Sequence, residues 1–280
     1  MSSFGDYLNL VGSVLFLSLV FYPFELLAPA EKRQPWSKRL VNLVYVPASL
    51  LAALFVLQPV ANAVVGRLFV VSGGGVLPRM MGPPQSLLHQ LLFALGFALF
   101  WDFWQYWLHR LQHRVPWLWE THKFHHSETA LNATTQARHH LLHSALTIVF
   151  YLPVVLVIGT HTPHYLAIFV LFRLWGLVNH ANLRLNLGPL TPLVSGPQWH
   201  RIHHSVVDVH RDKNFATFFP LIDKVFGTYY RPARGEFPPT GLVGEEPHPL
   251  NEATIGPLAA WIRRGRALLE RVGHTAANES

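Results

Sequence analysis

The sequence predicts an all-α integral membrane protein with about four to five membrane-embedded helices and a cytosolic helical cap. The first observation is composition: half of the 280 residues are hydrophobic and 13% are charged, about half the charged share of soluble domains. The second is that apolar residues gather in long stretches almost free of charge, each near the roughly 20 residues that a spanning helix needs. The third is a concentration of histidines between residues 109 and 204.

Four apolar stretches account for the membrane-embedded helices. Three of them, 8–27, 40–66 and 80–101, are long enough to cross a bilayer as helices. The fourth, 144–172, carries no charge but is interrupted at 159–163. Because two full spans would need about 40 residues, we expect a short helical hairpin there that enters only part of the bilayer.

Three regions follow from this pattern. Residues 1–100 form the N-terminal transmembrane helices, and 101–235 form a histidine-rich region that includes the hairpin at about 144–178. Residues 236–280 form a C-terminal tail. Within the tail, apolar residues alternate with arginines over 255–272, which predicts an amphipathic helix that lies on lipid headgroups or packs on the cytosolic domain.

The positions of lysine and arginine predict the orientation of the helices. The loop after the first stretch contains four basic residues, and the loop after the second contains only Arg67 and Arg79. Because lysine and arginine accumulate in short cytoplasmic loops, we expect the first loop and the histidine-rich region on the cytoplasmic side. The chain is then a multi-pass protein of a bacterial inner membrane or an endoplasmic reticulum.

Charge and cysteine usage exclude several classes of protein. The formal net charge is +7, and in so hydrophobic a chain a basic excess favours contact with the anionic headgroups of a lipid bilayer. No basic stripe with interleaved aromatic residues occurs, so we expect no nucleic-acid partner. The absence of cysteine excludes disulfides, thiolate-ligated haem and cysteine-held iron–sulfur clusters.

The histidines have the spacing of metal ligands. His109 and His113 are four apart, two HxxHH clusters begin at His122 and His200, and His180 stands between the clusters. Positions i, i+3 and i+4 share one face of a helix, so each cluster offers up to three imidazoles to one point. Imidazole is the commonest neutral metal ligand near physiological pH. The candidate metal ligands are His109, His113, His122, His125, His126, His180, His200, His203 and His204.

Nine imidazoles are more than one metal ion uses. A catalytic zinc site takes three protein ligands and a water molecule, whereas two metals with four or five nitrogens each would use all nine. The sequence therefore predicts a histidine-rich dimetal site held by the cytosolic helical cap. Imidazole suits iron, zinc, copper and nickel, so the ligand type alone does not name the metal. A metal pair at a membrane surface favours oxygen activation on a lipid.

Polar residues near the histidines are candidate partners for the second nitrogen of each ring. A ligand histidine usually donates that N–H to a carboxylate or a carbonyl, which sets its tautomer. Asp102 lies seven residues before His109 on the same helical face, and Asp212 follows the last cluster. Asn179 directly precedes His180. We expect Asp102, Asp212 and Asn179 to orient the ligands.

The region from Trp101 to Tyr230 resembles the fatty acid hydroxylase / sterol desaturase superfamily of integral-membrane di-iron enzymes. The resemblance rests on three histidine boxes in order, HRLQH at 109–113, HKFHH at 122–126 and HRIHH at 200–204. It implies two non-haem iron ions held by the nine histidines, O2, a lipid substrate and a separate electron-donor protein. We expect zinc to be able to replace iron in purified protein.

Two positions depart from the pattern of the superfamily. Its members often have an Arg-x-His-Pro run after the second box, whereas residues 138–141 read Arg-His-His-Leu here. Despite this difference, we keep His140 and His143 as candidate extra ligands that could approach the site. Some hydroxylases carry a further histidine four residues before the equivalent of His180, where this chain has Gly176, so a tenth ligand is not expected there.

Three classes of function fit the pattern. The leading one is a membrane-bound di-iron oxygenase that hydroxylates or desaturates an unactivated C–H bond of a lipid such as a sterol or a fatty acyl chain. A zinc membrane hydrolase is an alternative, but the chain lacks the HExxH motif that would supply a general base. The third class is a metal- or haem-binding membrane transporter or electron carrier. Haem carriers pair histidines within opposing spans, and transporters carry polar residues near the midplane that these spans lack.

Overall fold

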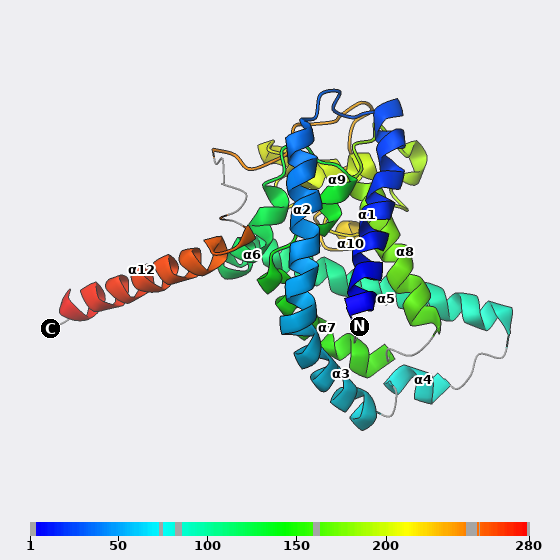
Figure 1. Cartoon of the computed structure of the whole chain (residues 1–280), viewed down its shortest axis with the longest axis horizontal. Coiled ribbons are helices and arrows are strands. Elements are labelled where there is room, and N and C mark those ends of the chain that lie inside the picture. Colours follow the sequence, from blue (N-terminus) through cyan, green and yellow to red (C-terminus); the bar gives the residue numbers. More distant parts are fainter. Residues whose placement is uncertain are drawn as a thin grey trace.

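The computed structural model of the chain describes residues 4–72, 75–81, 86–158, 163–244, 251 and 253–278. Helices dominate the architecture (Figure 1), and the described residues form no β-strand. Pairing of the β type is limited, in this part of the chain, to two isolated bridges, Pro29–Leu183 and Ser205–Thr240. The prediction of an all-α protein is confirmed.

The first hundred residues fold into long apolar helices. Helix α1 spans Phe4–Leu27 and α2 spans Trp36–Ala52. A π-helical turn, Ala53–Leu57, joins α2 directly to α3 at Gln58–Ser72, so one continuous helical segment covers the second predicted span. Figure 1 shows α1 and α2 side by side, with α3 continuing α2 toward the end of the molecule opposite α9.

Helix α5, which spans Leu87–Arg114, takes the place of the third predicted span. The predicted start at residue 80 is too early, because a separate short helix, α4 at Val76–Met81, occupies that region and 82–85 lie outside the described residues. Helix α5 begins where the hydroxyl of Ser86 accepts the backbone N–H of His89. Such an N-cap satisfies one of the unpaired donors of the first turn, and an apolar stretch does not reveal it.

A sharp turn joins α5 to α6, which spans Pro116–His126. The residue before a proline is driven out of the helical conformation, and Val115 accordingly has an extended backbone with φ −99° and ψ 113°. Pro116 itself suits the first position of α6, where no N–H donor is needed. The turn packs α6 against α5 and so brings the second histidine box against the first.

The predicted hairpin is present as two helices, α7 at Leu141–Ile158 and α8 at Pro163–His180. Most of the predicted break, residues 159–162, lies outside the described residues. Both helices pack on α5 through an apolar core built around Phe97, Trp101, Val154, Ile158 and Phe172. Short helices complete the cap: η2 at Ala133–Ala137, η3 at Gly188–Leu190, α9 at Pro197–His203, η4 at Asp208–His210 and α10 at Pro220–Val225.

Several of these helices suit a bilayer. Within the described residues, three segments are long and apolar enough to cross a membrane, Trp36–Leu68, Leu87–Arg114 and Leu141–Ile158, and two shorter apolar helices cover Val11–Leu27 and Ala167–His180. Large apolar side chains on them are exposed, among them Phe16, Val44, Phe55 and Leu91. Because soluble proteins rarely expose so much apolar surface, the chain has the construction of an integral membrane protein.

A buried ion pair ties the first two helices to the histidine-rich region. Glu25 of α1 and Arg39 of α2 lie 2.7 Å apart. The other oxygen of Glu25 accepts the backbone N–H groups of Ala133 and Asn182 at 2.9 and 2.8 Å. A buried charge persists only with such partners, and these partners position the segment that follows His180.

Helix α12 spans Gly256–Asn278, in the part of the tail where the sequence predicts an amphipathic helix. Its beginning packs on α6, where the indole of Trp261 donates to the carbonyl oxygen of Trp117 at 2.8 Å. Arg264 pairs with Glu120 at 2.7 Å. The rest of α12 projects away from the other helices (Figure 1), so the helix is docked at one end only.

Candidate metal centre

Two groups of histidine rings adjoin one another where α5, α6, α8 and α9 meet. In each group, one nitrogen of every ring lies within 4.8 Å of one nitrogen of every other ring. Group A contains five histidines: His109, His113, His122, His126 and His203. Group B contains four: His125, His180, His200 and His204. The structure therefore brings all nine predicted ligands together, as a set of five beside a set of four.

Each HxxHH box divides its rings between the two groups, instead of aiming all three at one point as the sequence suggested. On α6, His122 and His126 enter group A while His125 enters group B. The box of α9 does the converse: its middle ring, His203, enters group A and the outer two enter group B. Around a helix, i and i+4 differ by about 40°, whereas i+3 lies about 60° away in the other direction. The outer pair and the middle ring therefore face different centres.

Within each group the Nε2 atoms converge. The Nε2 atom of His126 lies 3.1, 3.2 and 3.2 Å from those of His113, His122 and His203. In group B the Nε2 atom of His180 lies 2.9 Å from that of His200 and 3.0 Å from that of His125. The Nε2 atoms of His200 and His204 lie 3.1 Å apart. Two nitrogens that ligate one ion at about 2.1 Å lie roughly 3 Å apart when they subtend a right angle. Each group thus offers a donor set that fits one metal ion.

Backbone carbonyls orient three of these rings through the nitrogen that faces away from the centre. The separations between Nδ1 and the carbonyl oxygen are 2.9 Å for His109 and Phe215, 2.8 Å for His203 and Lys213, and 2.7 Å for His180 and Gly176. Because a carbonyl oxygen can only accept, these Nδ1 atoms carry the proton. Their Nε2 lone pairs are then free to bind a metal.

Burial favours the neutral form of the six histidines in the two HxxHH boxes. Burial holds the pKa of each of these histidines well below the usual 6.5, and the neighbouring imidazoles lower the pKa further. The six residues are His122, His125, His126, His200, His203 and His204. Burial in a low-dielectric interior disfavours the charged imidazolium. Neutral imidazole is the form that binds metal, so the cap keeps its candidate ligands ready for an ion.

Two buried carboxylates shape the loop 213–219, which supplies two of the orienting carbonyls. Asp102 accepts three successive backbone N–H groups, at 217–219, with distances of 2.8, 3.0 and 2.6 Å. Asp223 accepts the N–H groups at 215–216, at 2.8 and 2.9 Å. The expectation that Asp102 bonds directly to a ligand ring is therefore wrong, because the loop amides use both of its oxygens. Its link to the histidines runs through the loop, which sequence spacing does not reveal.

The other two predicted partners differ from each other. Asp212 lies 3.7 Å from Nδ1 of His113 and 3.4 Å from Nε of Arg114, as a charged neighbour of a ligand ring. Asn179 instead donates to the carbonyl oxygen of Thr217 at 2.8 Å and to the hydroxyl of Ser195 at 3.2 Å. Its amide therefore anchors the end of α8 on the same loop, one residue before His180.

Two further histidines lie against the centre. One nitrogen each of His139, His143 and His122 lie within 4.8 Å of one another. The ring of His139 stacks on that of His125, with centroids 4.5 Å apart and planes 15° apart. His143 was a predicted extra ligand, but His139 was missed. Its spacing of four from His143, the spacing of His109 and His113, is the signal that could have found it.

His140, the other predicted extra ligand, does not reach the centre. Its Nε2 lies 2.7 Å from the carbonyl oxygen of Thr254, and its Nδ1 accepts the backbone N–H of Leu142 at 3.0 Å. Both ring nitrogens are used, so no lone pair remains for a metal. His140 instead joins the start of α7 to the residues before α12.

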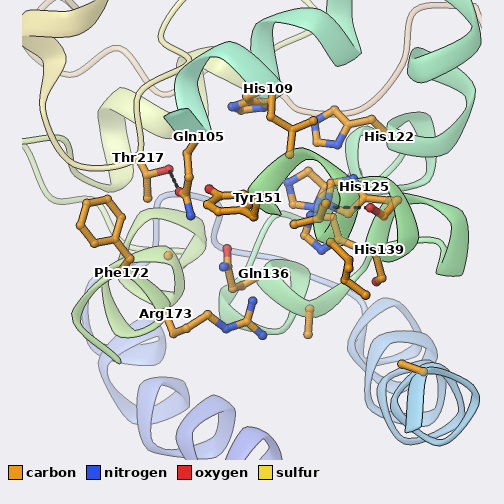
Figure 2. Close-up of a pocket in the computed structure, with 18 of the residues that line it drawn as sticks. Gln105, His109, His122, His125, Gln136, His139, Tyr151, Phe172, Arg173 and Thr217 are labelled. Atoms are coloured by element: carbon orange, nitrogen blue, oxygen red, sulfur yellow. Dashed lines mark hydrogen bonds between the residues drawn. The ribbon is translucent and has the colours of Figure 1, made fainter. Parts of the chain in front are cut away.

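A cavity of about 510 Å³ adjoins both groups. Rings of His109, His122 and His125 reach its wall (Figure 2), and apolar side chains of α2, α5, α7 and α8 form much of the rest. Ligand sites typically enclose about 300–1,000 Å³ with mainly apolar walls and a few polar groups. The cavity therefore suits a largely apolar ligand that reaches the histidines.

Comparison with known proteins finds matches to the histidine-rich region and to lipid-modifying enzymes. The family model described as fatty acid hydroxylase matches residues 94–228, which include all nine histidines. Human alkylglycerol monooxygenase is 35% identical over 152 residues, covering 54% of this chain and 32% of that protein. The ornithine lipid hydroxylase OlsE of Rhizobium tropici is 30% identical over 144 residues, covering 51% of this chain and 44% of that protein.

A more distant relative has a sterol-related name. Mouse lathosterol oxidase is 26% identical over 166 residues, covering 59% of this chain and 52% of that protein. The chain thus spans about a third to a half of the length of these relatives. No solved structure matches the chain significantly.

Proposed function

Because the chain belongs to the fatty acid hydroxylase superfamily, we propose that it is a membrane-bound, non-haem di-iron oxygenase of lipids. The proposed reaction hydroxylates or desaturates an unactivated C–H bond of a sterol or a fatty acyl chain. In hydroxylation, one atom of O2 enters the C–H bond and the other leaves as water. A separate electron-donor protein supplies the two electrons, and two protons from water complete the reaction.

The observation that carries this proposal is that histidine groups A and B both lie at the wall of one largely apolar cavity. A set of five nitrogens beside a set of four matches two adjacent metal ions. The apolar wall matches a lipid chain. Lipid-modifying oxygenases need both features in one place, because the C–H bond must lie next to the metals.

The residues of this chain would divide the work as follows. When bound, the two irons supply activation of O2, which no protein side chain supplies. Groups A and B hold the ions, with neutral rings whose outward nitrogens are fixed by the carbonyls of residues 176, 213 and 215. The apolar cavity wall orients the lipid chain and keeps water from the reacting carbon.

The rest of the chain fits a membrane enzyme of this kind. We assign catalysis to residues 101–235, the membrane anchor to 1–100 and a surface-attached tail to 236–280. The basic loop after α1 supports a cytoplasmic position for the metal centre. A soluble donor could then deliver electrons from the cytoplasm, in either a bacterial inner membrane or an endoplasmic reticulum.

Metal content per chain tests the proposal most directly. We would express the protein with added iron, purify it in detergent and measure bound metals by elemental analysis. Close to two metal ions, mainly iron, are expected. The matched control is His89→Ala, which removes a histidine from the distant start of α5 and is expected to retain both ions.

A second measurement separates an oxygenase from a metal store. Iron-loaded protein with a chemical or enzymatic reductant, ¹⁸O2 and membrane lipids is expected to yield ¹⁸O-labelled alcohols or new alkenes. One zinc ion per chain together with ester hydrolysis would favour the hydrolase instead. A haem absorbance band would favour the electron carrier.

A further inference from the structure

The cavity beside the histidines contains one positively charged side chain, Arg173. It is the only lysine, arginine, aspartate or glutamate among the described residues of the cavity wall. Figure 2 shows its guanidinium reaching toward the cavity near Gln136. Ionisable residues in apolar membrane helices are rare and usually face a cavity or a partner of opposite charge. We therefore expect an anion to lie beside the guanidinium of Arg173 on the apolar helix α8.

No acidic side chain in the described part of the chain supplies that anion. Among the described residues, the guanidinium lies over the ring of Phe169, 6.0 Å from its centroid, and its charge acts on the nearby imidazoles of His139 and His143. The ion pairs of the described residues all involve other cations. An arginine without a carboxylate, facing a cavity, is a typical binding group for carboxylate or phosphate oxygens.

Gln136 supplies a second donor beside this charge. Gly176 lies one helical turn after Arg173, and a Cβ at that position would overlap the side-chain amide of Gln136. The missing side chain lets this amide rest on the face of α8 between Arg173 and His180. Within the described part of the chain the side-chain amide of Gln136 makes no hydrogen bond, so its N–H groups are free to bind a ligand in the cavity.

We propose that Arg173 and Gln136 bind an anionic oxygen group, a carboxylate or a phosphate, carried by the lipid substrate. The inference rests on the proposed function, because it names the substrate class of that same site. Residues 173, 176 and 180 share one face of α8, and Arg173 lies roughly 10 Å along the axis from His180. The oxidised carbon therefore lies within a short run of methylene groups from the anionic group.

Binding of defined lipids without turnover tests the proposal. The probes are oleic acid, 1-oleoyl lysophosphatidic acid and methyl oleate, which share one acyl chain and differ in charge. Each competes with radiolabelled oleic acid for detergent-purified, metal-loaded protein under anaerobic conditions and without a reductant. We expect at least one of the two anions to bind ten-fold or more tightly than methyl oleate, and the tighter anion identifies carboxylate or phosphate as the group.

Variants then assign the preference to this pair of residues. Arg173→Gln is expected to abolish the preference for anions, and Arg173→Lys to retain part of it. Gln136→Leu is expected to weaken anion binding several-fold with little effect on methyl oleate. Arg184→Gln is the matched control, since Arg184 lies on the ring of Phe237 and outside the cavity wall, and it is expected to bind like the wild type.

Two results would overturn the proposal. Equal affinity of the wild type for the anions and for methyl oleate needs no variant and would do so directly. An Arg173→Lys or Gln136→Leu protein with normal metal content and unchanged anion preference would also do so. Since binding is read without oxidation, a protein that prefers anions but never oxidises them would contradict the proposed function alone.

Discussion

The Nδ1 atom of His109 lies 2.9 Å from the carbonyl oxygen of Phe215, a residue 106 positions further along the chain. The same residue donates its backbone N–H to Asp223. A candidate metal ligand on α5 is thus oriented by a loop that a buried carboxylate holds in place. The centre depends on this loop as well as on the helices that carry the histidines.

The first prediction concerns Asp223, which orients the loop without touching a ring. Asp223→Asn keeps the size of the side chain but replaces one accepting oxygen with a donor, so at least one loop amide loses its partner. We expect metal affinity to fall about 10–100-fold, the usual effect of losing a group that supports a ligand. Competition with a chelator measures it. Asp208→Asn, at an exposed position, should bind like the wild type, and equal affinity of both variants would contradict the role of Asp223.

The second prediction separates the two groups. His204→Ala leaves three nitrogens in group B, whereas His203→Ala leaves four in group A. Because fewer ligands hold an ion less tightly, the His204 variant is expected to lose one metal ion per chain and the His203 variant to lose less than one. Elemental analysis of both proteins, purified side by side, measures this. Equal and complete loss of both ions would show that the groups do not bind independently.

The third prediction distinguishes His140 from the ligands. His140→Ala leaves the N–H of Leu142 and the carbonyl oxygen of Thr254 without their ring partner, at a cost of about 1–3 kcal/mol. The metal content should remain that of the wild type, because the ring does not face either group. Thermal unfolding and elemental analysis of one preparation measure the two effects. A loss of metal with unchanged stability would make His140 a ligand.

The fourth prediction is the pH dependence of the metal-free protein. Burial lowers the folded-state pKa of the six histidines in the two HxxHH boxes below 6.5. Below that pH the unfolded chain binds more protons than the folded one, so stability falls as pH falls and is fully present above about 6.5. Each of these histidines can contribute up to about 1.4 kcal/mol per pH unit.

Chemical unfolding of the chelated protein between pH 5 and 8 checks this dependence. Replacement of one of the six rings by alanine, as in His200→Ala, should make the loss below pH 6.5 less steep. Stability that stays constant down to pH 5 would mean that these rings are not buried as neutral groups in the metal-free protein.

Much of the fold could be predicted because its signals are local. Apolar runs of helical length predicted the long helices, and the break near residue 160 predicted the pair α7 and α8. The start of α5 was misplaced because a serine N-cap, and not the end of an apolar run, begins that helix. Eight of the nine residues in the two metal groups could be named from spacing, because a helix repeats its faces every three to four residues. His180 stands alone in the sequence, and the family resemblance named it.

The sequence by itself determined which nine histidines could meet, that the chain is helical, and that it resembles lipid oxygenases. Only the tertiary structure decided how the nine rings divide into group A with five and group B with four, since the angle between two helices sets which ring faces which metal position. It also decided that Asp102 holds a loop, that His139 lies at the site while His140 does not, and that Arg173 faces the cavity. These contacts join residues distant in sequence, and periodicity along a single helix carries no information about them.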